Sequence, residues 1–183
     1  MVWNATEPFD FEGAFYRVSR ASTDVQGHQK PHVPLWFGGV SDAAIPAGAK
    51  HCDTYALFGE PRAQVQELMT RINAEAAVYQ RKPAYNLSFR PIIGATEEEA
   101  WRKAKAILAG VEAAGGGSKS RVPEAETARR LMSLIDGGEV QDERLWVPIA
   151  AAAQGSGNST ALVGTSEQVA EAIATYYDMG VSG

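Results

Sequence analysis

The chain of 183 residues is 45% hydrophobic, 21% charged and 9% aromatic, which is an ordinary composition for a globular protein. This composition excludes a disordered chain, and the length allows one domain. The 17 basic and 22 acidic residues give a formal charge of −5. Because no run of Lys or Arg exceeds two residues, we expect no binding to nucleic acid.

Cysteine and histidine usage is sparse. Cys52 is the only cysteine, so it excludes an intramolecular disulfide, and the three histidines are scattered without zinc-ligand spacing. The first 20 residues lack the apolar core of a signal peptide. The apolar runs are also far shorter than the ~20 residues of a membrane span. We therefore expect a cytoplasmic protein with no metal site and no membrane contact.

Short apolar runs alternate with longer segments of helical period, which predicts an α/β fold with a parallel sheet. The opening segment differs, because the turn DFEGAFY at 10–16 is typical of a hairpin or an extended excursion. Continuous apolar runs predict buried strands. We place them at 35–37, 54–58, about 85–93 and 161–163.

Apolar residues at helical spacing predict helices over 61–79, 97–113, 123–136 and from Thr165 to Gly180. The pairs Thr96/Glu99 and Thr165/Gln168 have the spacing of capping boxes. A further helix start at 41–42 is locally inconsistent, because Pro46 and Gly48 would lie inside the helix. We expect that helix to be short, kinked or displaced.

The first candidate site is the turn Gly38-Gly39-Val40-Ser41 between a buried strand and that helix. Its two glycines allow close approach of the backbone to a ligand, and free N–H groups at the helix start would face an anion such as phosphate. Ser41 would add a hydroxyl donor. A plain strand-to-helix turn is the alternative, because a Gly-Gly-x-Ser turn is much less specific than a full phosphate-binding loop.

The second candidate lies on the strand at 85–93. Residues two apart share a face, so Ser88 and Arg90 are expected to point together, opposite Leu87 and Phe89. Arg90 would bind phosphate, sulfonate or carboxylate, or else close an internal salt bridge. Pro91 disfavours a central strand, and a bulge near Arg90 would resolve the conflict.

The small and polar residues at 151–160 form a third segment of interest. They allow either a mobile lid over a site or a solvated linker.

Six motifs together resemble the bacterial luciferase-like flavin-dependent monooxygenases, and most closely the alkanesulfonate monooxygenases. They follow one another in order over nearly the whole chain. The motifs are FEGAFYRV at 11–18, PLWFGGVSDAA at 34–44, DTYALFGEPRAQV at 53–65, TEEEAWRKA at 96–104, DERLW at 142–146 and NSTALVGTSEQVAEAIATYYDMGV at 158–181.

The resemblance implies part of a (β/α)8 barrel. A complete barrel needs about 250 residues, so residues 1–183 would form a single incomplete domain. They would hold the C-terminal portion, with about four strands missing before it. The strands present would be numbers five to seven and the start of strand eight at 179–183. The segment 112–160 would be the insertion and lid.

The resemblance also implies the chemistry: a two-component monooxygenase that uses O2 and reduced FMN from a separate NAD(P)H-dependent flavin reductase. In sulfonate substrates the C–S bond breaks to give aldehyde and sulfite. Gly38, Gly39, Val40 and Ser41 match the family's phosphate-binding turn, and Phe58 matches an aromatic residue of the flavin pocket. Arg90 would be the catalytic and anion-binding residue, with Ser88 beside it at the substrate.

Departures from the family pattern leave the substrate open. Alkanesulfonate monooxygenases carry Arg and His where this chain has Ser88 and Arg90, and their lid arginine is replaced near Gly155. A sulfone, another organosulfur compound or a different small molecule is therefore an alternative. A deazaflavin (F420)-dependent oxidoreductase is a rival activity. A non-catalytic module is the rival class, because the open edges of a partial barrel favour association, including a homo-oligomer.

Overall fold

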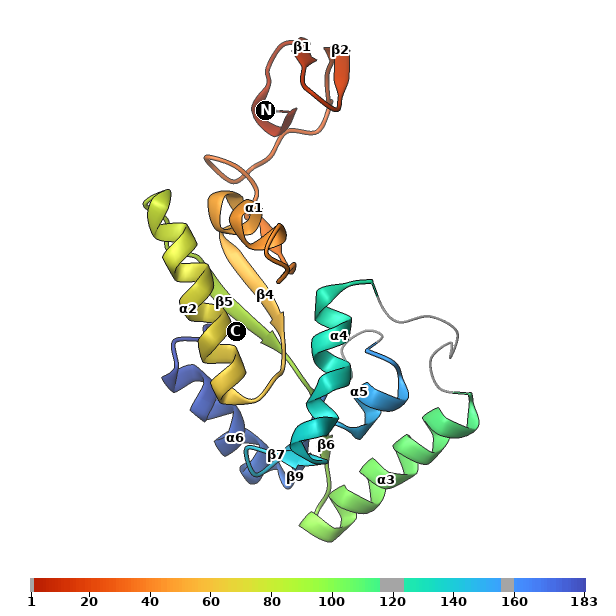
Figure 1. Cartoon of the computed structure of the whole chain (residues 1–183). Coiled ribbons are helices and arrows are strands. Elements are labelled where there is room, and N and C mark those ends of the chain that lie inside the picture. The colour runs from red at the N-terminus through yellow and green to blue at the C-terminus, as the bar shows by residue number, and fades with distance from the viewer. Residues whose placement is uncertain (1, 116–123, 156–159) are drawn as a thin grey trace. The chain divides into compact units, whose positions relative to one another are not determined.

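The computed structural model describes residues 2–115, 124–155 and 160–183. It divides into two compact units, Met1–Leu35 and Trp36–Gly183, which we describe separately (Figure 1).

The first unit is built on a β-hairpin. A short 3-10 helix, η1 (Val2–Asn4), precedes two antiparallel strands, β1 (Phe9–Glu12) and β2 (Arg17–Ala21). Phe11 lies opposite Val18, while Glu12 lies opposite Arg17 and forms an ion pair of 3.3 Å with it. The turn closes through the Gly13 N–H, which donates to the Tyr16 carbonyl at 2.9 Å. The hairpin predicted at 10–16 is confirmed.

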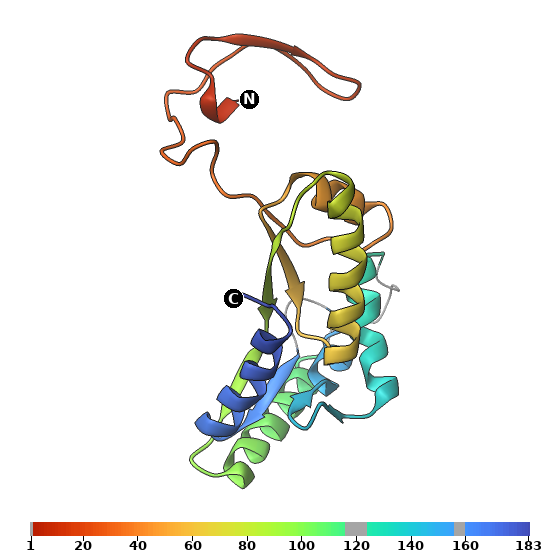
Figure 2. The same ribbon diagram turned by 90° about the vertical axis from the view of Figure 1, so that its left-hand side faces the viewer.

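The second unit begins with a parallel sheet in the order β3-β4-β5, formed by Trp36–Phe37, Thr54–Phe58 and Ala84–Ser88. Helices α1 (Ala44–His51) and α2 (Arg62–Val78) pack against each other, and α2 runs alongside the β4–β5 pair (Figure 2). The first two predicted strands and the helix at 61–79 are confirmed. After the last helix, α6 (Ser166–Asp178), the chain lies beside β5, where the Ser182 N–H donates to the Tyr85 carbonyl at 2.9 Å.

Helix α1 resolves the conflict at Pro46. It begins at Ala44 rather than at 41–42, so Pro46 falls in the first turn, where a backbone N–H has no partner within the helix. Gly48 is required by packing, because a Cβ there would lie 2.5 Å from the Phe37 ring and 2.7 Å from the Tyr55 ring. The helix is therefore short and displaced, as expected.

A second sheet has the order β6-β9-β8-β7, formed by Arg90–Ile93, Ala161–Gly164, Leu145–Trp146 and Val140–Gln141. Only the β6–β9 pair is parallel. The predicted single strand at 85–93 is wrong, because the chain changes neighbours at Phe89 and continues as β6 in this sheet. Pro91 is tolerated because β6 is an edge strand within the described residues.

Four helices belong to this part of the chain: α3 (Glu97–Ala113), α4 (Glu126–Ser133, continued by the 3-10 turn η2 at Leu134–Gly137), α5 (Pro148–Ala152) and α6 (Ser166–Asp178). The capping box of α6 is complete. At α3, Thr96 accepts the Glu99 N–H, but the Glu99 carboxylate accepts from Ala95 instead of Thr96. The helix predicted at 123–136 is shorter than expected, and residue 123 lies outside the described residues.

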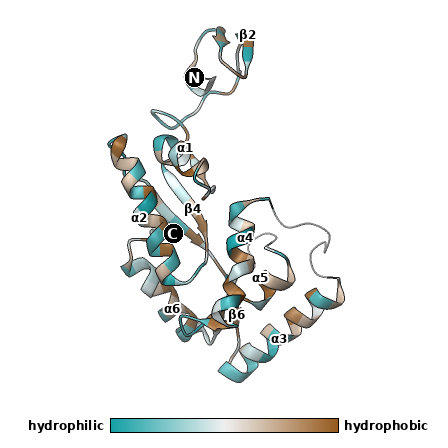
Figure 3. Cartoon of the chain, viewed as in Figure 1, coloured by the Kyte–Doolittle hydropathy of each residue, from teal (hydrophilic) through white to brown (hydrophobic). Residues whose placement is uncertain are grey.

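The core forms three clusters. One lies between β4, β5 and helices α1 and α2 and includes Tyr55, Leu68 and Ile72. The other two lie between the second sheet and helices α3 to α6. The helices carry hydrophilic and hydrophobic residues together (Figure 3). None of the helices that the described residues form has both the length and the apolar character needed to cross a membrane.

Candidate functional site

A hollow of about 330 Å³ lies on the sheet β3-β4-β5 and brings together three of the predicted site residues, Gly38, Phe58 and Ser88. They come from three segments that are adjacent in space, because Phe58 of β4 lies opposite Ser88 of β5 and Gly38 directly follows β3. Sequence analysis missed the other lining residues, which are Trp36, Ala56, Leu57 and Asn86.

The alternation of side chains along the strands explains why the hollow forms on this face. Tyr55 and Leu57 on β4 are buried in the helix-covered core, whereas Ala56 and Phe58 between and after them are only partly buried. Residues two apart on a strand share a face, so Ala56 and Phe58 face the other way. The hollow lies toward the carboxyl ends of the parallel strands, where ligands of α/β proteins commonly bind.

The glycine turn holds the chain close to β4 and α1. A Cβ at Gly38 would lie 3.2 Å from the Ala56 carbonyl oxygen, and one at Gly39 would lie 2.8 Å from Ala44 Cβ. Val40 is 5% exposed and packs in the core, so its side chain is not available to a ligand at the turn.

Ser41 accepts the hydrogen bonds of the first N–H groups of α1. Its carbonyl accepts the Ala44 and Ile45 N–H groups at 2.9 and 3.0 Å, and its hydroxyl oxygen also accepts from Ala44 at 3.2 Å. The expectation that free N–H groups at the helix start would face an anion is therefore wrong for these two residues. A phosphate contact at the turn 38–41 stays a prediction.

Tyr55 supports the turn from beneath. Its hydroxyl donates to the Gly39 carbonyl, and its ring packs edge-on against Phe37 with centroids 5.7 Å apart. Burial raises the pKa of Tyr55 to about 12, so the hydroxyl stays protonated and keeps donating at neutral pH.

The structure separates Ser88 from Arg90. Ser88 ends β5 and its carbonyl accepts the Gly59 N–H, whereas Arg90 begins β6 and its N–H donates to the carbonyl of Thr160, which directly precedes β9. Ser88 lines the hollow, and Arg90 is exposed and does not. The two residues thus belong to different sheets, because backbone hydrogen bonding changes partner at Phe89, and the expectation that their side chains point together stays a prediction. The roles assigned to Arg90 stay predictions.

The segment after Phe58 is fixed by contacts that sequence analysis missed. Gly59 lies under Phe89, and a Cβ there would come within 2.1 Å of the Phe89 ring. Glu60 is 3% exposed, and its carboxylate accepts two hydrogen bonds from Arg130 at 2.5 and 3.0 Å. Hydrogen bonding to this carboxylate raises the pKa of Arg130. The only sign of this ion pair in the sequence is an acidic residue two positions after the end of an apolar strand.

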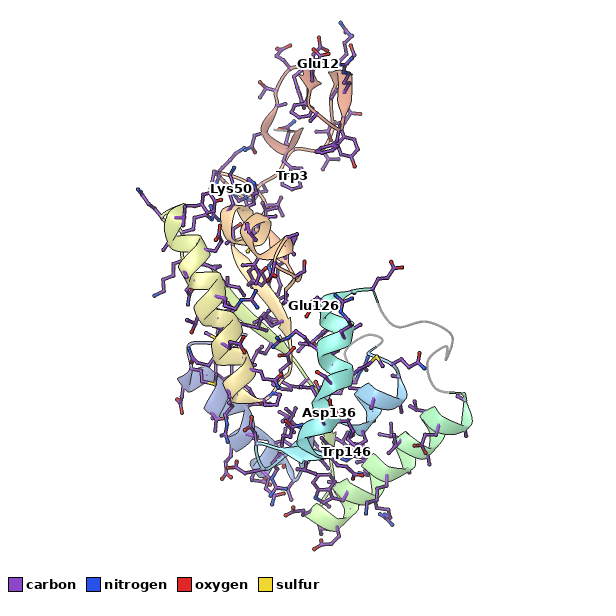
Figure 4. All side chains as sticks on the ribbon, in the orientation of Figure 1. Trp3, Glu12, Lys50, Glu126, Asp136 and Trp146 are labelled. Atoms are coloured by element: carbon purple, nitrogen blue, oxygen red, sulfur yellow. The ribbon has the colours of Figure 1, made fainter. Side chains whose placement is uncertain are left out.

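Arg130 lies on α4, in the segment predicted to be an insertion and lid. Figure 4 shows Glu126 at the start of α4 and Asp136 in η2, which continues that helix. Gly155 packs against this helix with a φ of 67°, and a Cβ there would lie 2.4 Å from the Ala128 carbonyl oxygen. The rest of the predicted lid at 156–159 lies outside the described residues.

A family model for luciferase-like monooxygenases matches residues 1–183, so the chain belongs to this family. The predicted membership and the predicted partial barrel are confirmed. The particular likeness to alkanesulfonate monooxygenases stays a prediction.

Solved structures show the same fold at low identity. DmoA from Hyphomicrobium sulfonivorans is 18% identical with a TM-score of 0.66, and the match covers 95% of this chain and 41% of that one. EDTA monooxygenase (EmoA) from Chelativorans sp. BNC1 is 19% identical with a TM-score of 0.65 over 97% of this chain and 44% of that one. An F420-dependent secondary alcohol dehydrogenase is 12% identical with a TM-score of 0.64 over 99% and 50%. The chain thus spans about half or less of each structure.

Proposed function

We propose that this chain supplies part of the flavin site of a two-component monooxygenase. It would use O2 and reduced FMN from a separate NAD(P)H-dependent flavin reductase, and it would oxygenate a small organosulfur or related compound. The observation that carries the proposal is the hollow that joins Gly38, Phe58 and Ser88 in a chain of this family.

The residues around the hollow fit a flavin. The turn Gly38–Ser41 would hold the phosphate through its backbone N–H groups, because two missing Cβ atoms allow close approach. Phe58 and Trp36 would pack against the ring system, and Ser88 and Asn86 would donate hydrogen bonds to its polar edge or to substrate. The hollow, at about 330 Å³, lies at the lower end of ligand-pocket sizes. Bound FMN would carry the oxygen chemistry.

An anaerobic titration with reduced FMN tests the proposal. Trp36 lines the hollow and is 60% exposed, so its fluorescence should report binding. We expect saturable quenching in the micromolar range, equivalent to about −8 kcal/mol, and its loss in Trp36→Phe. A folded chain that gives no saturable signal, with no binding by equilibrium dialysis, would contradict the proposal.

A deazaflavin (F420)-dependent oxidoreductase is the second candidate, and the fold shared with an F420-dependent alcohol dehydrogenase favours testing it. The same titration with reduced F420 in parallel separates the two. Tighter binding of F420 than of reduced FMN would favour the oxidoreductase. Binding of neither would favour a non-catalytic association module.

A further inference from the structure

We propose that Glu60 and Arg130 are positioning residues that hold Phe58 at the wall of the flavin hollow. The inference rests on the proposed function, because it gives this ion pair a part in binding flavin.

The ion pair of Glu60 and Arg130 is largely buried. The Glu60 side chain is 5% exposed and that of Arg130 is 19% exposed, and two hydrogen bonds join them. A buried charge is costly unless it is paired. The pair therefore requires α4 to stay against the loop that follows β4, although Glu60 and Arg130 are 70 positions apart in the sequence.

The loop that follows β4 is also held by aromatic residues. The Tyr176 hydroxyl of α6 donates to the Glu60 carbonyl at 3.0 Å, and the Tyr176 ring lies 4.9 Å from that of Phe89. Phe89 in turn covers Gly59. Glu60 is thus held by an ion pair and a hydrogen bond, and Gly59 is held by the Phe89 ring that covers it.

The ion pair is connected to Phe58 through α4 and through the backbone of the loop. Phe58 packs against the cluster that contains Leu131, which is adjacent to Arg130 on α4 and fully buried. A shift of α4 would therefore disturb the cluster against which Phe58 packs, and a shift of Glu60 would act on the backbone two residues after Phe58. Either shift would change the wall of the hollow.

The chain offers a matched control pair. Arg144 also forms two hydrogen bonds to a carboxylate, that of Glu97, at 2.7 and 3.3 Å, and it has a similar side-chain exposure of 18%. Neither residue lines the hollow. Losing this pair should affect stability without reaching Phe58.

The experiment compares wild type, Arg130→Lys, the double variant Glu60→Met/Arg130→Met, and Arg144→Gln. Replacing both charges with apolar side chains avoids leaving one unpaired, so the double variant should fold. Two readouts are used: the dissociation constant for reduced FMN, and the ¹⁹F NMR signal of Phe58 in protein labelled with fluorophenylalanine. The chain has six phenylalanines, and Phe58→Leu assigns the signal. Urea unfolding records stability.

We expect the double variant to move the Phe58 signal and to raise the dissociation constant about tenfold. Arg130→Lys keeps a positive charge beside Glu60, so it should change the Phe58 signal and the dissociation constant less than the double variant does. Arg144→Gln should leave the dissociation constant within about twofold of wild type and the signal in place. An unchanged Phe58 signal in the double variant, or an equal change in Arg144→Gln, would overturn the inference. If the signal moves as expected but wild type binds no reduced FMN, the positioning contact is supported and the proposed function is contradicted.

Discussion

The two faces of β4 and β5 differ in what they do, although the same ten residues form both. On one face, Tyr55, Leu57, Tyr85 and Leu87 are buried against α1 and α2. On the other, Ala56, Phe58, Asn86 and Ser88 line a hollow and are only partly buried. Every second residue thus contributes to the buried core, and the residues between them would contact flavin under the proposed function.

The largest effect is expected on the covered face. Leu87→Ala removes a side chain that is 9% exposed and does not line the hollow, and it should lower the free energy of unfolding by about 2–5 kcal/mol. Urea denaturation measures this. The affinity of the remaining folded protein for reduced FMN should be nearly unchanged. A loss of binding free energy larger than the loss of unfolding free energy would contradict the distinction between the two faces.

A substitution on the open face should do the reverse. Ala56→Phe would place a ring in the hollow, and it should weaken reduced FMN binding about tenfold or more, or at least ~1.4 kcal/mol. Its urea midpoint should stay close to that of wild type. Fluorescence titration measures the affinity, and unaltered binding would show that flavin does not occupy this face.

A smaller effect is expected for Ser88→Ala, which removes one hydroxyl from the hollow. The loss of one hydrogen bond should cost about 0.5–1.5 kcal/mol of ligand affinity. The adjacent Asn86→Ala variant gives a comparison of two polar groups on one strand. If neither variant changes the affinity, these groups do not contact the ligand.

The smallest effect concerns acid. Among the described residues, those that line the hollow include no carboxylate and no imidazole, so an effect of acid should arise away from the hollow. Hydrogen bonds from Arg144, Gln168 and Trp101 lower the pKa of Glu97 from 4.5 to about 2. A pKa that is lower in the folded state gives stability that is present above pH 4.5 and is lost as the pH falls toward 2.

Unfolding of wild type between pH 5 and pH 2 should therefore be steeper than that of Glu97→Gln, as followed by circular dichroism. Glu112→Gln on the same helix is the control, because Glu112 is exposed and forms none of the contacts that hold Glu97. Equal acid profiles for wild type and Glu97→Gln would contradict the account.

Much of the fold could be predicted from local pattern. The strand at 54–58 and the helix at 97–113 have the predicted bounds, because a continuous apolar run and a helical period are properties of neighbouring residues. Strands β7 and β8, with two residues each, and the five-residue helix α5 were missed because they are too short to show a period.

The candidate site divides in the same way. The glycine turn and Phe58 lie beside strands that the sequence reveals, so their approach in space follows from the predicted parallel sheet. The break at Phe89 and the pairing of Glu60 with Arg130 depend on tertiary neighbours, and no local pattern encodes them. The expected partnership of Ser88 with Arg90 spans this break and stays a prediction.

Backbone NMR under anaerobic conditions tests the central claim most directly. Reduced FMN is added to ¹⁵N-labelled protein and the shifted amide signals are mapped. The account predicts saturable shifts at Gly38, Gly39, Phe58 and Ser88, with the amides of the α1 and α2 surface unchanged. Shifts confined to that helical surface, or no shifts in folded protein, would contradict it.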